Sequence, residues 1–116
     1  NPSRAPGLNA QVPSIQPSAP GEEDPRVAEQ LKEVREQLTL LGIRMDTVRG
    51  SLDTLRRQQA ASGLGLRADM ANAAQRMEYY YSRVEQALKN KDAEAAKKNL
   101  DLAEREVSKL EGFLGR

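Results

Sequence analysis

The chain has 116 residues, of which 30% are charged, 38% are hydrophobic and only 3% are aromatic, and its formal net charge is +1. This near-neutral balance argues against a dedicated nucleic-acid surface, which gains its affinity from clustered positive charge. Histidine and cysteine are both absent, which excludes disulfides, thiolate metal sites and catalysis by either side chain. No apolar run approaches the roughly 18 residues that span a bilayer, so we expect no transmembrane segment.

Residues 1–25 hold all six prolines, together with many Ser, Gly, Asn and Gln residues. Such a composition cannot bury enough apolar surface to offset the entropy lost on ordering the chain. We therefore expect a disordered Pro-rich linker that tethers the rest of the chain. Because the sequence begins with Asn rather than Met and shows no leader, we also expect it to be a piece of a longer protein.

A first helix is predicted from residue 26 to about residue 62. Asp24 can cap its start, and Pro25 suits its first turn. Apolar residues then recur in alternating steps of four and three over about four heptads, a pattern typical of a coiled-coil-like seam. This seam consists of Val27, Leu31, Val34, Leu38, Leu41, Met45, Val48, Leu52 and Leu55.

Two further seams predict shorter helices over residues 66–89 and 92–114. Gly63 and Gly65 favour a turn before the second helix, although one long helix with a stutter would also fit the change of phase. Asp92 can cap the third helix. The second seam consists of Leu66, Met70, Ala73, Met77, Tyr80, Val84 and Ala87, and the third of Ala93, Ala96, Leu100, Ala103, Val107, Leu110 and Leu114.

These elements predict an all-α fold, a three-helix up-down-up bundle or coiled-coil hairpin over residues 26–116, preceded by the linker. At about 1.5 Å per residue, the first helix should be about 20 Å longer than the other two. We expect the excess to leave the seam over residues 27–40 without a partner in its own chain. An exposed apolar seam of that length indicates that another chain covers it.

All three tyrosines lie in the segment MEYYYSR, residues 77–83. Helical geometry places Tyr80 on the seam, Tyr81 beside it and Tyr79 about 100° further round, so we expect them to be buried, half-buried and exposed. The better supported interpretation is that Tyr80 and Tyr81 pack against the alanines of the third helix. The alternative is that Tyr79 and Tyr81 contact a partner protein or stack on a base.

Charged residues of opposite sign flank neighbouring seams, which favours ion pairs within the bundle. Leu40 and Ile43 lie off the first seam, so the middle of the first helix is apolar on two faces, for core packing or for partner contact. The basic flanking residues are Arg44, Arg49, Arg56, Arg76 and Arg83, and the acidic ones are Glu104, Glu106 and Glu111.

Nothing in the pattern predicts catalysis, a cofactor or a metal site. The charged residues belong on solvated helix faces, and no carboxylate pair projects from a seam. The segment GLGLRAD fits neither of the common phosphate-binding loop patterns, and EF-hand loops and Glu-x-x-His motifs are absent. We therefore expect that the chain is not an enzyme and that it uses no cofactor and no small-molecule substrate.

The segments RMEYYYSRVEQALKNKDAEAAKKNLDLAERE and AAKKNLDLAEREVSKLEGFLGR overlap and cover about the last fifty residues. They resemble the helical hairpins found as C-terminal extensions of some bacterial multidomain proteins, including bacterial-type serine/threonine kinases. ALKNKDAEAAKKNLDLAERE is also similar to a generic alanine-rich hairpin such as a tetratricopeptide unit, without the repeat of about 34 residues. The first resemblance implies an accessory scaffold with a catalytic domain upstream. None of the kinase catalytic motifs occurs, so no functional residue carries over.

Our first hypothesis is a non-catalytic structural and interaction module, a helical scaffold that self-associates or docks to another helical protein. Its predicted partner-binding residues are Val27, Leu31, Val34, Leu38, Leu40, Ile43, Tyr79 and Tyr81. The alternative is a nucleic-acid or anionic-surface binder. That binder would use Arg56, Arg57, Arg67, Arg76 and Arg83 together with Tyr79.

Overall fold

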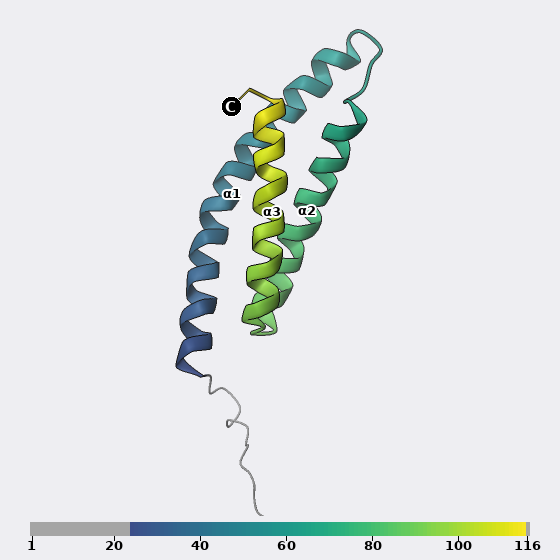
Figure 1. The fold of residues 1–116 in the computed structure, drawn as a ribbon. Coiled ribbons are helices and arrows are strands. Elements are labelled where there is room, and N and C mark those ends of the chain that lie inside the picture. The colour runs from purple at the N-terminus through teal and green to yellow at the C-terminus, as the bar shows by residue number, and fades with distance from the viewer. Residues whose placement is uncertain (1–23, 116) are drawn as a thin grey trace, which may run out of the picture.

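The structure of the chain, a computed structural model, describes residues 24–115. Within these residues it contains three helices and no strand: α1 (Pro25–Ala60), α2 (Ala68–Lys89) and α3 (Ala93–Phe113). The helices run up, down and up in one bundle (Figure 1). The predicted all-α bundle is confirmed, and α1 and α2 are separate helices rather than one. Of the predicted linker, only Asp24 and Pro25 lie within the described residues, and they begin α1.

Side-chain caps define where α1 and α3 begin. Asp24 Oδ1 accepts the backbone N–H of Arg26 at 2.8 Å, and Asp92 Oδ1 accepts that of Ala95 at 3.1 Å. Each bond satisfies one of the N–H groups that a helix start leaves without a partner, as predicted for both aspartates. Before α2, Arg67 makes no side-chain cap.

Gly63 ends α1 in a left-handed conformation, with φ of +77°. Its N–H donates to the carbonyl of Ala60 at 2.9 Å, and the N–H of Leu64 donates to that of Gln59 at 2.8 Å. These two bonds form the turn that commonly closes helices, and glycine is favoured there because it has no Cβ. The predicted turn after the first helix is therefore confirmed.

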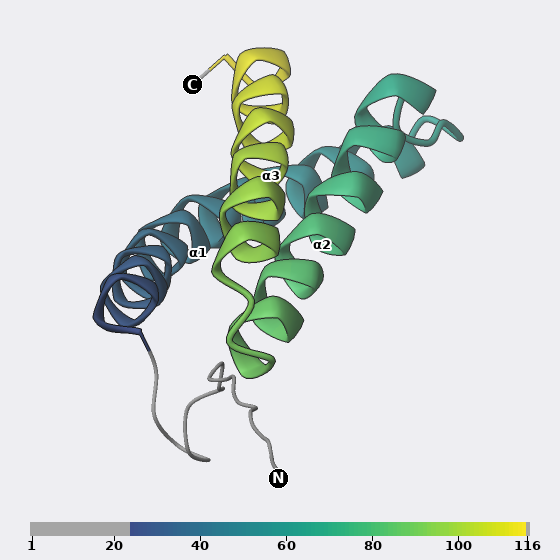
Figure 2. The same ribbon diagram turned by 60° about the horizontal axis from the view of Figure 1, so that its bottom comes forward.

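The three seams meet in one core. α2 and α3 are the most closely packed pair, and α1 lies nearer to α3 than to α2. Small side chains explain the close pair, because alanines at Ala73, Ala87, Ala96 and Ala103 let two backbones approach. α1 contributes larger core residues and lies across one side of the hairpin (Figure 2). Its buried residues are Leu31, Val34, Leu38, Leu41, Met45, Val48 and Leu52.

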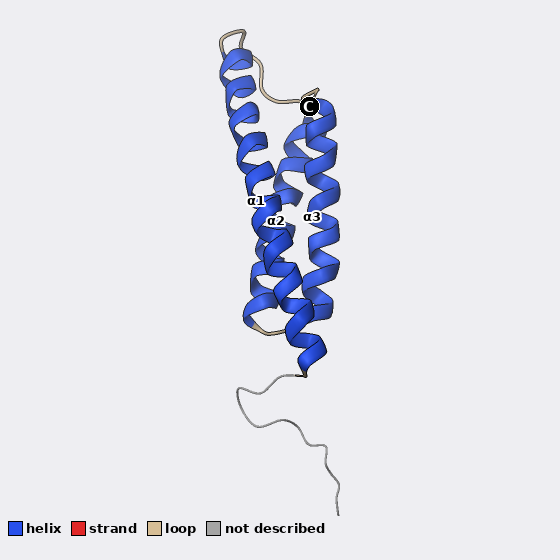
Figure 3. Cartoon of the chain, turned by 90° about the vertical axis from the view of Figure 1, so that its left-hand side faces the viewer, coloured by secondary structure: helices blue, strands red, loops and turns tan. Residues whose placement is uncertain are grey.

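The long helix α1 extends beyond the hairpin at both ends, by its first turn and by its C-terminal turns (Figures 1 and 3). The expectation that the seam over residues 27–40 has no partner in its own chain is wrong, because Leu31, Val34 and Leu38 are only 2%, 2% and 7% exposed. The cause is the connection between α1 and α2. Residues 64–67 are not helical and can span roughly 13 Å at about 3.3 Å each, which carries the start of α2 back along α1.

None of the described helices is both long and apolar enough to cross a membrane.

Candidate functional site

The structure divides the predicted partner-binding residues into covered and exposed groups. Leu40, Ile43 and Tyr79 are 63%, 61% and 58% exposed. The other five are covered to different degrees: Leu31, Val34 and Leu38 are buried, and Val27 and Tyr81 are half-buried. Only the exposed three can contact a partner through most of their side chain while the bundle stays closed.

A strip without charged residues runs along the outward face of α1. It consists of Leu40, Ile43, Thr47, Gly50 and Thr54, all of them exposed, and we call it the α1 strip. Its members follow one another in steps of three and four, each two positions after a residue of the buried seam. At about 100° per residue they lie about 200° from the seam, on the side of α1 opposite its buried residues.

The threonine hydroxyls near the strip bond to their own helix. Thr47 Oγ1 donates to the carbonyl of Ile43 at 3.3 Å, and Thr39 Oγ1 donates to that of Arg35 at 3.0 Å. Because these hydroxyls already have an acceptor in the helix, the threonines add methyl surface beside Leu40 and Ile43 without needing a polar partner. The strip is therefore more apolar than its composition suggests.

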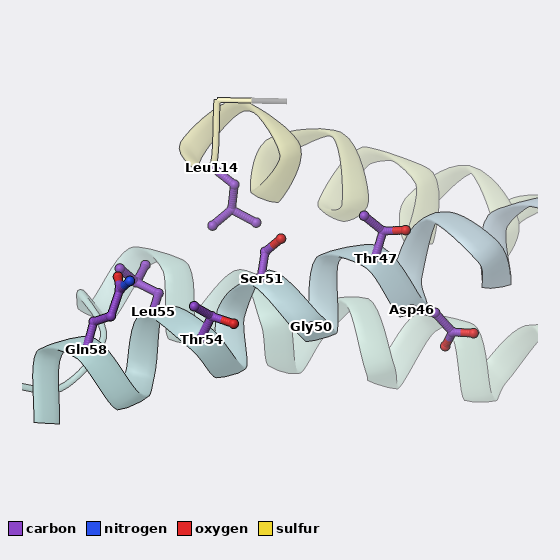
Figure 4. A pocket seen from close by; sticks show the side chains of 8 residues that line it. All are labelled: Asp46, Thr47, Gly50, Ser51, Thr54, Leu55, Gln58 and Leu114. Carbon is purple, nitrogen blue, oxygen red and sulfur yellow. The ribbon is translucent and has the colours of Figure 1, made fainter.

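The C-terminal half of the α1 strip borders an open hollow of about 580 Å³. Leu114 reaches from the end of α3 toward Ser51 of α1 (Figure 4). Small or polar side chains make up most of the α1 side of this hollow. Its lining consists of Asp46, Thr47, Gly50, Ser51, Thr54, Leu55, Gln58 and Leu114. The α1 strip thus has a bulge, formed by Leu40 and Ile43, followed by a hollow.

Bidentate ion pairs fix α1 to both helices of the hairpin. Arg44 donates to Glu111 of α3 at 3.0 and 2.7 Å, and Arg49 donates twice to Glu78 of α2 at 2.7 Å. These hydrogen bonds raise the pKa of both guanidinium groups, so they stay charged. The prediction of ion pairs within the bundle is confirmed for Arg44, whereas Arg49 pairs with a glutamate of α2 that was not among the predicted acidic residues.

Three of the five arginines that the nucleic-acid or anionic-surface hypothesis names form ion pairs with acidic side chains. Arg57 pairs with Asp53, and Arg67 bonds to Asp69 at 2.6 Å. Arg76 Nε lies 3.2 Å from Oε1 of the buried Glu106, an ion pair without hydrogen-bond alignment. These three arginines therefore do not form an unpaired basic cluster.

Arg83 lies over the exposed ring of Tyr79, with 6.0 Å between its guanidinium carbon and the ring centre. It was expected to pair with a glutamate of α3, and it packs on an aromatic face instead. The ring of Tyr79 also meets that of Tyr80 edge-on, with the two centres 5.5 Å apart.

Tyr80 is half-buried rather than buried as expected. The alanine-lined contact between α2 and α3 is too close for a whole phenol ring, which stays at its edge with access to water. Tyr81 is half-buried as predicted, and burial raises the pKa of its phenol. Two tyrosines therefore pack against the core, and only Tyr79 is displayed on the surface.

Comparison with known proteins returns no match to this chain among family models, curated proteins or solved structures. Among the described residues, no cluster of acidic side chains is suited to a metal ion. The sequence pattern did not predict the hollow beside the α1 strip, because Leu114 reaches it from a different helix. The pattern that could have indicated the strip is the second run of steps of three and four, from Leu40 to Thr54.

Proposed function

We propose that this chain is a non-catalytic structural and interaction module, a helical scaffold whose helix α1 binds another helix. The observation that carries this proposal is the exposure of Leu40 and Ile43, at 63% and 61%, on a helix whose opposite face is already packed. A bundle with a complete core gains nothing in its own fold from a second apolar face. Contiguous apolar surface of this kind is typical of interaction sites.

The geometry of the α1 strip favours a helical partner. Apolar and small residues in steps of three and four form the pattern by which one helix packs along another. The ion pairs of Arg44 and Arg49 hold α1 against the hairpin, so the strip is ordered before it binds. A preorganised surface loses less conformational entropy on association. A role as an accessory scaffold within a larger protein would suit such a module.

Binding of nucleic acid or of an anionic surface is the second candidate. Arg83 stacked on the exposed Tyr79 favours it, because bases stack on such platforms. The neutralisation of Arg57, Arg67 and Arg76 by acidic neighbours weakens it. Ionic strength separates the two candidates, since phosphate binding falls steeply with added salt and apolar helix pairing does not.

Site-specific photo-crosslinking tests the proposed function. A photoreactive residue is placed at Ile43 or, as a control, at the exposed Asp101 of α3, in the protein expressed in its source cells. We expect Ile43 to give a discrete crosslinked species, with a second copy or with another protein, and Asp101 to give none. The absence of a species from Ile43, or the same species from both positions, would contradict the proposal.

A further inference from the structure

We propose that the α1 strip pairs with the α1 strip of a second copy of this chain, in antiparallel orientation and centred on Thr47. The inference rests on the proposed interaction function and names its partner. Its structural basis is the bulge formed by the exposed Leu40 and Ile43, which is followed on the same face of one helix by a hollow lined from Asp46 to Gln58.

Shape selects the antiparallel orientation. With Thr47 at the centre, Ile43 faces Ser51 of the second copy, and Leu40 faces Thr54 of the second copy. A twofold axis then places both bulges in both hollows at once, as a self-complementary interface requires. A parallel pair would set each bulge against the same bulge of the second copy and leave both hollows empty.

Charge selects the same orientation. The N-terminal part of the outward face of α1 carries the exposed residues Glu29, Glu33 and Glu36, with Lys32 among them, whereas the C-terminal part carries Arg57. An antiparallel pair brings Glu36 beside Arg57 of the second copy, which also pairs with Asp53 of its own helix, so that Glu36 would join an existing ion pair. A parallel pair would bring each glutamate next to the same glutamate of the second copy. This repulsion between like charges weakens association. Opposed helix dipoles add to the preference.

The size of the α1 strip predicts a weak complex. From Leu40 to Thr54 the strip is about 21 Å long at about 1.5 Å per residue. One helix face of this length buries less than the roughly 800 Å² per partner of a standard interface. We therefore expect a dissociation constant of about 10–500 µM, so that pairing depends on local concentration.

Sedimentation equilibrium of the 116-residue chain from about 10 µM to about 1 mM tests the pairing. We expect a monomer–dimer equilibrium whose dissociation constant rises at least about tenfold in Ile43→Glu, because the variant buries an unpaired charge. Tyr79→Glu, which changes a comparably exposed apolar residue on α2, should shift the constant by less than about twofold. Circular dichroism checks that both variants are folded.

Two outcomes would overturn the pairing while the proposed function stands. One is a chain that stays monomeric up to about 1 mM but crosslinks through Ile43 to a different protein. The other is a dimer that Ile43→Glu leaves intact, while the crosslink from Ile43 again joins a different protein. If Ile43 gives no crosslink at all, the proposed function itself fails.

Orientation is tested by disulfide formation, because the chain contains no cysteine and only introduced thiols can react. Glu36→Cys and Gln58→Cys face one another in the antiparallel pair, whereas two copies of Glu36→Cys hold their thiols about 33 Å apart. We expect a disulfide dimer from the mixture of the two variants and none from either alone. Dimers from each variant alone, or none from the mixture, would overturn the antiparallel arrangement.

Discussion

The phenol of Tyr81 lies against Gly42 of α1, so that a methyl group on the Cα of Gly42 would lie 3.3 Å from the Tyr81 hydroxyl oxygen. This close approach explains a glycine inside a helix, where it otherwise costs about 1 kcal/mol relative to alanine. α1 and α2 are the least closely packed pair of helices. Tyr81 reaches across the space between them, so this tyrosine serves packing within the chain.

Replacing the two glycines of α1 by alanine should have unequal effects. At Gly50 a Cβ would meet nothing within 4 Å, so Gly50→Ala should stabilise the fold by about 1 kcal/mol. Gly42→Ala should gain clearly less, because the Tyr81 side chain must move. Urea unfolding of dilute protein measures both, and adding Tyr81→Phe to Gly42→Ala should restore the gain. Equal gains from the two single variants would contradict the contact.

Leu38 and Leu40 lie two residues apart and should respond oppositely to truncation. Leu38 is 7% exposed in the core and Leu40 is 63% exposed on the α1 strip. Leu38→Ala should cost about 2–5 kcal/mol of unfolding free energy, whereas Leu40→Ala should change it by less than about 0.5 kcal/mol. Denaturant titration at low concentration measures the pair. A similar loss from both would show that α1 is rotated from the described phase.

Lys91 occupies a backbone conformation that favours glycine, with φ of 56°. It closes α2 by donating its N–H to the carbonyl of Leu88 at 3.1 Å, while the N–H of Asp92 donates to that of Ala87 at 2.9 Å. Lys91→Gly should therefore be about 1 kcal/mol more stable than Lys91→Ala. The comparison removes the same ammonium group from both variants, and thermal unfolding decides it. An alanine variant as stable as the glycine one would exclude a strained backbone.

The phenol of Tyr81 should make stability fall at high pH. Burial raises the pKa of Tyr81 above the value of about 10 that an unfolded tyrosine has. The neutral phenol thus stabilises the fold below about pH 10, and this contribution is lost as the pH rises through the folded pKa. Urea midpoints measured from about pH 8 to 11 should fall more steeply for the natural chain than for Tyr81→Phe. Parallel curves would contradict the shift.

The faces that each helix buries could be predicted from the sequence. Apolar residues in steps of three and four place Met45, Met77 and Val107 in the core, and all three are buried there. The starts of α1 and α3 followed from Asp24 and Asp92, because capping depends on residues only two or three positions away. Information of this kind is local, so it can be read from one helix without knowing which other helices pack against it.

The axial position of α1 against the hairpin was decided only in the tertiary structure. A heptad seam presents nearly the same pattern after a shift of one heptad, about 10 Å, so periodicity cannot say which heptads are covered. The conformation of residues 64–67 decides it: the hairpin covers Leu31 and Val34, and α1 extends beyond the hairpin at both ends (Figure 1). The hollow beside Gly50 likewise exists only because Leu114 arrives there from α3. Both features depend on how separate helices are placed in space, which no single helix encodes.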